Sequence, residues 1–390
     1  MLSFLKPATR FVKGAALSAA VLTVAACDPS SLNTGQRIST TAPVPVALLV
    51  PAGSSNSGDA LLAQSLENAA KLAIADLEGV QIDLRVYPTA GDPATAQASA
   101  LKAVDEGAKI ILGPVFGEAA NAAATAVASQ NVNVLSFSNN TTIAGGNLFV
   151  LGPTFDNTAN RLVAFARANG KDGIMSVYSQ NSAGQLGNTA ISNAIAAQGA
   201  RSAGAVGYEF SQEGVIAAVS QIKLTAEQNL ADALFLTSNT SGALPLLTQL
   251  LPESGLSSET TQFIGLTRWD IPAQTLELPG VQGGWFALPD PALTDQFQSR
   301  YAQAYGGLPH PIGGLAYDGI AAIGALVKSG NANALTSSAL TQGAGFQGVN
   351  GIFRLRTDGT NERGLAVATI RDKKVVIIDP APTRFAGAGI

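Results

Sequence analysis

The sequence predicts an α/β protein of two lobes, each a parallel sheet flanked by helices, with hinge strands joining the lobes. From Val44 onward, short β-branched runs alternate with Ala-rich amphipathic segments, which is the pattern of parallel βα units. The alternation restarts after Gly152-Pro153, and two more helices and two strands follow near the C-terminus. The chain is therefore expected to leave the first lobe, build most of the second and return.

The first lobe is predicted from the segment that begins at Val44. Its strands are expected at 45–50, 82–88, 109–114 and 132–138, and its helices at 59–77, at 94–106 and up to Gln130. Asp92 and Pro93 supply an N-cap and an N1 proline to the second of these helices.

The second lobe repeats the same plan. Its strands are expected at 173–179, 203–210, 231–238 and 261–267, and its helices at 156–169, 184–197, 213–222 and 241–251. Two late helices, 293–306 and 315–330, are followed by a closing hairpin of 351–359 with 365–378.

Segments rich in Gly and Pro mark the passages between the lobes, near 151–153, 284–290 and 341–350. The first lobe is therefore assigned to 44–152 plus 287–345, the second to 153–286 plus 346–380, and a C-terminal tail to 381–390. A cleft between such lobes binds ligands at the carboxyl ends of the strands.

The first 26 residues are typical of a bacterial export signal. Lys6, Arg10 and Lys13 form a basic region, and the apolar run 14–26 follows it. A membrane-spanning helix needs about 20 apolar residues, so this run is too short and is expected to be cleaved.

The apolar run ends in Val24-Ala25-Ala26-Cys27, which resembles the lipobox of bacterial lipoproteins, and Cys27 is the one cysteine of the chain. An exported protein with a single thiol has no intrachain disulfide partner, whereas a thioether-linked lipid needs none. We expect residues 27–43 to be a lipidated cysteine and a flexible tether, because they are polar and broken by Pro and Gly. The choice between inner and outer membrane stays open.

The composition argues against several classes of function. Removing the three basic residues of the signal from the 23 Lys and Arg leaves 20 against 27 Asp and Glu, a net charge of −7, and no basic cluster for nucleic acid. One histidine, His310, and one cysteine cannot make a metal site or a nucleophile with its base. We expect no catalytic residue, no metal and no cofactor.

Segments 111–140 and 177–200 resemble the corresponding stretches of type I periplasmic binding proteins of the leucine/isoleucine/valine-binding kind. More specifically, GLTRWDIP, GGWFALPDP, RYAQAYGGLP, LAYDGIAAIGAL and GIFRLRTDG resemble a subgroup described as penicillin-binding protein activators. The resemblance covers almost the whole chain after the tether, and it implies the type I periplasmic binding protein fold.

The resemblance also indicates where a ligand would bind and which groups are missing. In amino-acid-binding members, a hydroxyl in the loop after the third strand binds the ligand carboxylate. The corresponding loop here is Val115-Phe116-Gly117-Glu118, which has no hydroxyl, and the aromatic residue of their second lobe is replaced by Ala183. Asp270 is the one acidic candidate for a ligand ammonium. The candidate cleft residues are Ser54, Ser55, Phe116, Gly117, Ser138, Asn139, Asn140, Ser182, Ser238, Asn239, Arg268, Trp269 and Asp270. Asp318 is interpreted as a residue that caps or serves the first turn of its helix.

Two functions of different classes follow from the resemblance. The leading hypothesis is a periplasm-facing lipoprotein that activates a penicillin-binding protein in peptidoglycan synthesis, because five segments resemble the activator subgroup and the amino-acid site is weakened. The alternative is a substrate-binding lipoprotein that delivers an amino acid or another small polar ligand to an ABC transporter permease. Both hypotheses involve the membrane through the lipid anchor, and neither involves nucleic acid or enzymatic activity.

Overall fold

The structure is a computed structural model that describes residues 33–257 and 260–385. The predicted export signal, Cys27 and the last residues of the predicted tail lie outside the described residues. Within the part that is described, no helix combines the length and the apolar character needed to span a bilayer.

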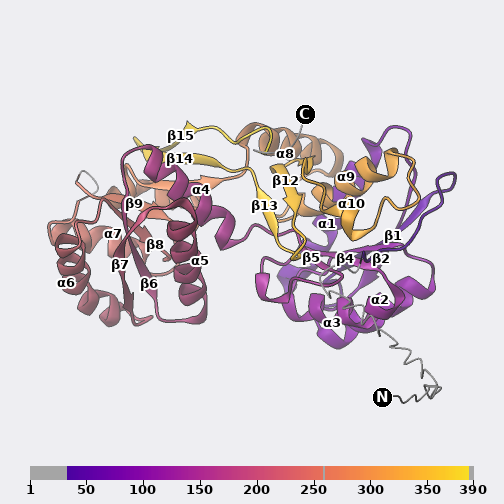
Figure 1. Cartoon of the computed structure of the whole chain (residues 1–390), viewed down its shortest axis with the longest axis horizontal. Helices are drawn as coiled ribbons and strands as arrows, with labels where there is room; N and C mark the ends of the chain where they lie inside the picture. The colour runs from indigo at the N-terminus through magenta and orange to yellow at the C-terminus, as the bar shows by residue number, and fades with distance from the viewer. Residues whose placement is uncertain (1–32, 258–259, 386–390) are drawn as a thin grey trace, which may run out of the picture. The chain divides into compact units, whose positions relative to one another are not determined.

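The first lobe contains a five-stranded parallel sheet with the strand order β2-β1-β3-β4-β5 (Figure 1). Its strands are β1 (Val44–Val50), β2 (Ile82–Pro88), β3 (Ile110–Leu112), β4 (Asn133–Ser136) and β5 (Leu148–Val150). Nearly every residue of β1, β3 and β4 is buried, as expected for strands with helices on both faces.

Two helical layers cover this sheet. Successive residues of β1 point to opposite faces, so that Leu48 packs in one layer and Leu49 in the other. One layer contains α1 (Ser57–Ala75), α8 (Pro291–Tyr305) and α9 (Gly314–Lys328), and the other contains α2 (Pro93–Asp105) and α3 (Gly117–Val127) (Figure 1). The predicted cap of α2 is confirmed, because Asp92 Oδ2 accepts a hydrogen bond from Thr95 N at 2.8 Å.

The second lobe contains a seven-stranded sheet with the order β15-β14-β10-β9-β8-β6-β7. Its strands are β6 (Gly173–Ser179), β7 (Arg201–Tyr208), β8 (Ala233–Leu236), β9 (Gln262–Gly265), β10 (Trp285–Leu288), β14 (Ala366–Arg371) and β15 (Lys374–Asp379). The first five are parallel, whereas β14 and β15 run antiparallel at one edge. One face is covered by α4 (Phe155–Ala168) and α5 (Ser182–Gln198), and the other by α6 (Gln212–Gln228) and α7 (Leu244–Glu253).

The end of the chain differs from the predicted closing hairpin. Residues 351–359 do not pair with 365–378, because β12 (Gly351–Leu355) pairs with β11 (Phe346–Gly348) and β13 (Asn361–Arg363) in a small sheet of its own. Phe346, Phe353 and Leu355 pack into the core of the first lobe, although 346–380 was assigned to the second. Only β14 and β15 join the second sheet, because β14 pairs with β10.

The predicted tether also differs from the structure at its C-terminal end. Residues 33–38 are bound to the first lobe by hydrogen bonds from side chains and backbone. Ile38 is buried in the first-lobe core. The polar composition of this segment reflects a hydrogen-bonded contact rather than a flexible linker.

Candidate functional site

The candidate residues of the first lobe lie in three loops at the carboxyl ends of β1, β3 and β4. Ser54 and Ser55 follow β1, where Ser54 Oγ accepts a hydrogen bond from Asn56 N at 3.1 Å. Asn56 in turn caps α1 by accepting from Gly58 N. Ser54 therefore shapes the start of α1, while Ser55 is exposed.

The structure brings Gly117, Ser138 and Asn140 together. A side chain at Gly117 would lie 3.3 Å from Asn140 Nδ2 and 3.6 Å from Ser138 Oγ. Ser138 is buried and its Oγ accepts from Asn140 N at 3.1 Å, and Asn140 Oδ1 accepts from Thr142 N at 3.0 Å. These polar groups stabilise their own loop, whereas the neighbouring Asn139 is exposed.

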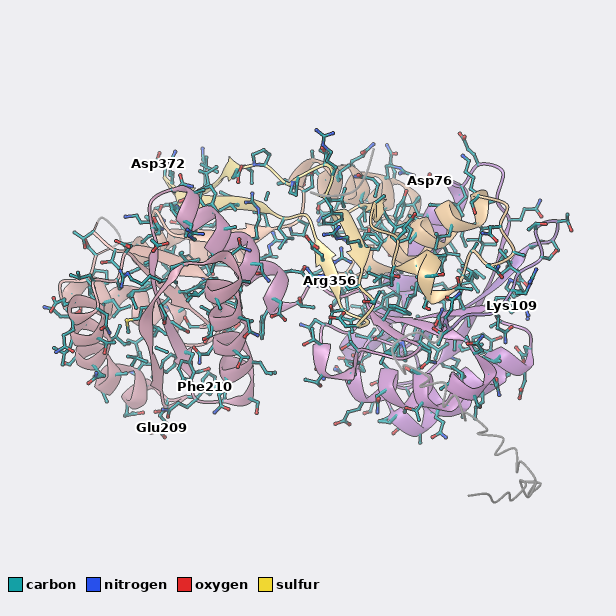
Figure 2. The ribbon with its side chains drawn as sticks, in the orientation of Figure 1. Asp76, Lys109, Glu209, Phe210, Arg356 and Asp372 are labelled. Carbon is teal, nitrogen blue, oxygen red and sulfur yellow. The ribbon has the colours of Figure 1, made fainter. Side chains whose placement is uncertain are left out.

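Three loops at carboxyl ends of strands present exposed apolar side chains. Phe116 follows β3 and is 39% exposed, Phe210 follows β7 and is 62% exposed (Figure 2), and Ile271 follows β9 and is 48% exposed. Phe116 was identified from the sequence. Phe210 and Ile271 were not, because an isolated apolar residue after a strand has no motif that distinguishes it.

The remaining polar candidates of the second lobe differ in exposure. Ser182 lies in the first turn of α5 and Asn239 follows β8, and both are exposed. Ser238 is buried, and within the described residues its Oγ has no hydrogen-bond partner. The assignment of Ser182, Ser238 and Asn239 as ligand contacts remains a prediction.

Trp269 is a core residue, which corrects its place among the candidate cleft residues. Its side chain is 0% exposed and belongs to the second-lobe core. Gly265 and Gly284 leave the space for the indole ring, because a Cβ atom at either position would lie within 2.2 Å of a ring atom. Trp269 therefore fixes the loop that carries its two charged neighbours.

Arg268 and Asp270 form a two-point ion pair on either side of Trp269. Arg268 Nε donates to Asp270 Oδ1 at 2.9 Å, and Nη2 donates to Oδ2. Asp270 is the less exposed partner, at 12% against 36% for Arg268. Among the described residues, the hydrogen bonds of Arg268 use Nε and Nη2, so Nη1 is the guanidinium donor of this loop that a ligand can use.

A cavity of about 270 Å³ lies where the predicted passages meet. It is lined by residues of all three passages, among them Pro153, Leu288 and Asn350. Arg268 also lines it and is the one residue among its described lining residues that the sequence predicted as a ligand contact. Its other walls are mainly apolar and include Phe155, Leu266, Ile271, Ile312, Leu315 and Leu365. Ile312 and Leu315, at the start of α9, were not identified from the sequence, because they carry no polar signal.

A buried ion pair borders this cavity and corrects the interpretation of Asp318. Asp318 Oδ1 accepts from Val349 N at 2.8 Å, and its Oδ2 accepts from Asn350 Nδ2 at 3.1 Å and from Arg363 Nη1 at 3.0 Å. Arg363 also donates twice to Leu151 O. Asp318 therefore joins α9 to the third and first passages instead of capping its own helix.

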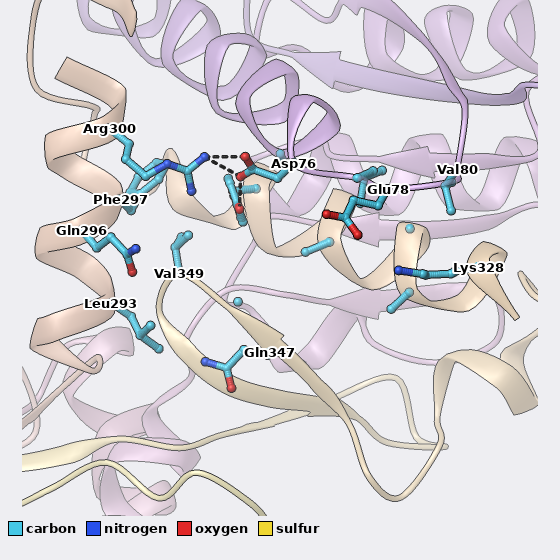
Figure 3. Close-up of a pocket in the computed structure, with 17 residues that line it drawn as sticks. Asp76, Glu78, Val80, Leu293, Gln296, Phe297, Arg300, Lys328, Gln347 and Val349 are labelled. Carbon is cyan, nitrogen blue, oxygen red and sulfur yellow. Dashed lines mark hydrogen bonds and ion pairs between the residues drawn. The ribbon is translucent and has the colours of Figure 1, made fainter. Parts of the chain in front are cut away.

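A second cavity, of about 380 Å³, lies on the first lobe between α1, α8, α9 and β11 (Figure 3). Arg300 Nη2 donates to both oxygens of Asp76, at 2.5 and 2.6 Å, and the Tyr317 hydroxyl donates to Oδ2. Partial burial opposes ionisation of Asp76, but the hydrogen bonds from Arg300 and Tyr317 outweigh it and hold the pKa of the carboxyl below its usual value. This network joins α1 to α8 and α9.

A family model described as periplasmic binding protein matches residues 43–374. No curated protein sequence matches the chain.

Solved structures share the fold at low sequence identity. The periplasmic ligand-binding protein of a branched-chain amino acid ABC transporter from Burkholderia xenovorans is 18% identical, with a TM-score of 0.67 over 86% of this chain and 96% of that one. A substrate-binding protein from Desulfitobacterium hafniense in complex with Leu is 16% identical, with a TM-score of 0.61 over 86% and 100%. A solute-binding protein from Rhodopseudomonas palustris in complex with 3,4-dihydroxybenzoic acid is 18% identical, with a TM-score of 0.60 over 89% and 98%.

Proposed function

The chain belongs to the periplasmic binding protein family, and from this premise we propose that it captures a small molecule in the periplasm and delivers it to an ABC transporter permease. The observation that carries the proposal is the cavity where the three passages between the lobes meet, which we call the hinge cavity. It combines Nη1 of the Arg268 guanidinium with apolar walls. Its volume of about 270 Å³ is near the lower end of the range of ligand pockets, about 300–1,000 Å³. The ligand is therefore small, and binding involves no chemical step.

The ligand class follows from the groups in and around the cavity. Arg268 Nη1 suits a carboxylate, and the side chains of Leu266, Ile271 and Ile312 suit an apolar body. We therefore favour a small monocarboxylate with an aliphatic or aromatic body.

A free amino acid fits this set less well. Its ammonium group needs an acidic partner, and the described lining residues of the cavity include no Asp or Glu. A buried charge without a partner costs several kcal/mol, so an amino acid in this cavity would leave its ammonium unmatched. The proposed ligand therefore differs from the leucine that the Desulfitobacterium hafniense protein binds, and it resembles the carboxylate that the Rhodopseudomonas palustris protein binds.

Activation of a penicillin-binding protein, the leading hypothesis from the sequence, has less support than transport. The relatives in the solved structures are transporter proteins, and none of those described above is an activator of a peptidoglycan synthase. The activator hypothesis rested on the resemblance of five segments to the activator subgroup and on the weakened amino-acid site, and a different ligand class accounts for the weakened site equally well. We further propose that Cys27 carries a lipid, so that the protein acts while anchored at the membrane.

Capture of the partner in cells tests the transport function. A photo-crosslinking residue at exposed Asn139 or Asn239 is expected to yield a covalent product with an ABC permease subunit after irradiation and membrane extraction. The same residue at exposed Ser129, which precedes β4 at the opposite edge of the first-lobe sheet, is the control and should yield less of it. Recovery of a bifunctional penicillin-binding protein from the Asn139 and Asn239 variants, with no permease, would contradict the proposal.

A further inference from the structure

The hinge cavity contains a second polar group besides Arg268, the side-chain amide of Asn350. Asn350 lies in the turn between β11 and β12, next to Val349, which is buried in the first-lobe core. Arg268 follows β9 of the second lobe. A ligand in the cavity therefore meets polar groups from both lobes.

The neighbours of Asn350 fix the orientation of its amide. An ionised carboxylate only accepts hydrogen bonds, so the amide atom that lies 3.1 Å from Asp318 Oδ2 is the donor Nδ2. Asp318 is itself buried and bound to Arg363 and Val349 N, and it holds Nδ2 in place. Gly314, at the start of α9, leaves room for the amide, because a Cβ atom there would lie 2.9 Å from Nδ2.

The carbonyl oxygen Oδ1 of Asn350 is an unused acceptor. Among the described residues it receives no hydrogen bond, and it is not one of the enclosed side-chain oxygens that lack a partner. Asn350 is half-buried and lines the cavity. A molecule in the cavity that carries a hydrogen-bond donor can therefore supply the missing partner.

The other polar side chains of the described lining offer fewer acceptors. The guanidinium groups of Arg268 and Arg363 only donate. The hydroxyls of Thr154 and Thr267 are each already in a hydrogen bond within the protein. Thr158 has a hydroxyl without a partner among the described residues, so it is the alternative to Asn350 that a test has to separate.

We propose that Asn350 is a specificity residue whose Oδ1 accepts a hydrogen bond from a ligand hydroxyl, so that the hinge cavity prefers a hydroxylated monocarboxylate to its unsubstituted parent. The inference rests on the proposed function and names the substrate class of that site. The carboxylate binds Nη1 of Arg268, the apolar body contacts the walls, and the hydroxyl donates to Asn350. A hydroxyl loses its hydrogen bonds to water when it enters an apolar cavity, and Oδ1 restores one of them.

Calorimetric titration of the wild-type protein tests the preference with benzoate, 3-hydroxybenzoate, 4-hydroxybenzoate and the two matching fluorobenzoates. Fluorine is similar in size to a hydroxyl but donates no hydrogen bond, so each fluorobenzoate is the matched control for its hydroxyl counterpart. At least one hydroxybenzoate is expected to bind about five- to tenfold more tightly than benzoate, which is the effect of one hydrogen bond. Its fluorine counterpart should show no such gain.

The variant Asn350→Leu has a side chain of similar volume without the acceptor. Because it also loses the hydrogen bond to Asp318, the measured quantity is the ratio of the dissociation constants of benzoate and the preferred hydroxybenzoate. A general change in the cavity weakens both ligands alike, whereas loss of the acceptor weakens only the hydroxybenzoate and brings the ratio to about one. Asn121→Leu, at an exposed position of α3 outside the described lining, is the matched control and should keep the wild-type ratio, as should Thr158→Val.

Binding of benzoate with no gain from either hydroxyl would overturn the inference and leave the proposed function standing. A fluorobenzoate that binds as tightly as its hydroxyl counterpart would also overturn it, and this comparison needs only the wild-type protein, even if Asn350→Leu does not fold. A preference that is lost in Thr158→Val and kept in Asn350→Leu would exclude Asn350 as its source. Binding of none of these carboxylates would contradict the proposed function and the inference with it.

Discussion

Replacing Asp318 by Asn is expected to destabilise the protein by about 3–5 kcal/mol, because it leaves Arg363 charged and buried without its partner. The side chains of Asp318 and Arg363 are 0% and 3% exposed. All three groups that contact Asp318 are donors, namely Val349 N, Asn350 Nδ2 and Arg363 Nη1. An Asn amide nitrogen would face a donor in either orientation, so the substitution loses a hydrogen bond as well as a charge.

Urea unfolding, followed by circular dichroism, measures this effect as a change in the free energy of unfolding. Asp379→Asn is the matched control, because the Arg161–Asp379 pair is more exposed, at 20% and 40%, and should contribute only about 0–1 kcal/mol. Arg363→Met combined with Asp318→Asn should recover part of the loss, since it removes the unpaired charge. A cost below about 1 kcal/mol for Asp318→Asn, or a double variant no more stable than the single one, would refute the reasoning.

Three other predictions concern the core, the histidine and the anchor. Trp269→Ala is expected to lower the free energy of unfolding by about 3–5 kcal/mol by leaving a cavity beside Gly265 and Gly284, and a near-neutral result in the same unfolding assay would argue against a core role. Burial lowers the pKa of His310, so the unfolded chain binds this proton more tightly and stability falls as the pH drops below about 6.5. His310→Gln should flatten that slope between pH 7 and 5, and an unchanged slope would exclude His310 as its source. Cys27→Ser should abolish incorporation of labelled palmitate, and persistent labelling would show that the lipobox interpretation is wrong.

The sequence predicted the alternating elements because they depend on local patterns. Buried parallel strands such as β1 and β8 are continuous apolar runs, and the adjacent residues Asp92 and Pro93 mark the start of α2. These signals depend on neighbours in the chain, so they can be recognised without knowing the tertiary structure. The two-lobed fold follows from their repetition.

The errors involve contacts that no local sequence pattern specifies. Thr34 was assigned to a tether because its neighbours are polar, yet it pairs with Asn133, 99 residues away. Trp269 was placed in the cleft because it follows a strand, and the space it fills depends on two glycines. Asp318 was interpreted within its own helix, whereas its ionic partner Arg363 is 45 residues away. Composition and periodicity carry no information about such pairings.

The central claim is that the hinge cavity binds a small monocarboxylate with an apolar body. Leucine and 4-methylpentanoate differ only in the ammonium group of leucine, so titrating both into the purified protein by calorimetry tests the claim most directly, with benzoate as an aromatic probe. We predict saturable binding of 4-methylpentanoate or benzoate, weakened at least tenfold, or about 1.4 kcal/mol, by Arg268→Gln with Asp270→Asn. We predict no binding of leucine at millimolar concentration. Tight binding of leucine, or no binding of either carboxylate, would contradict the account.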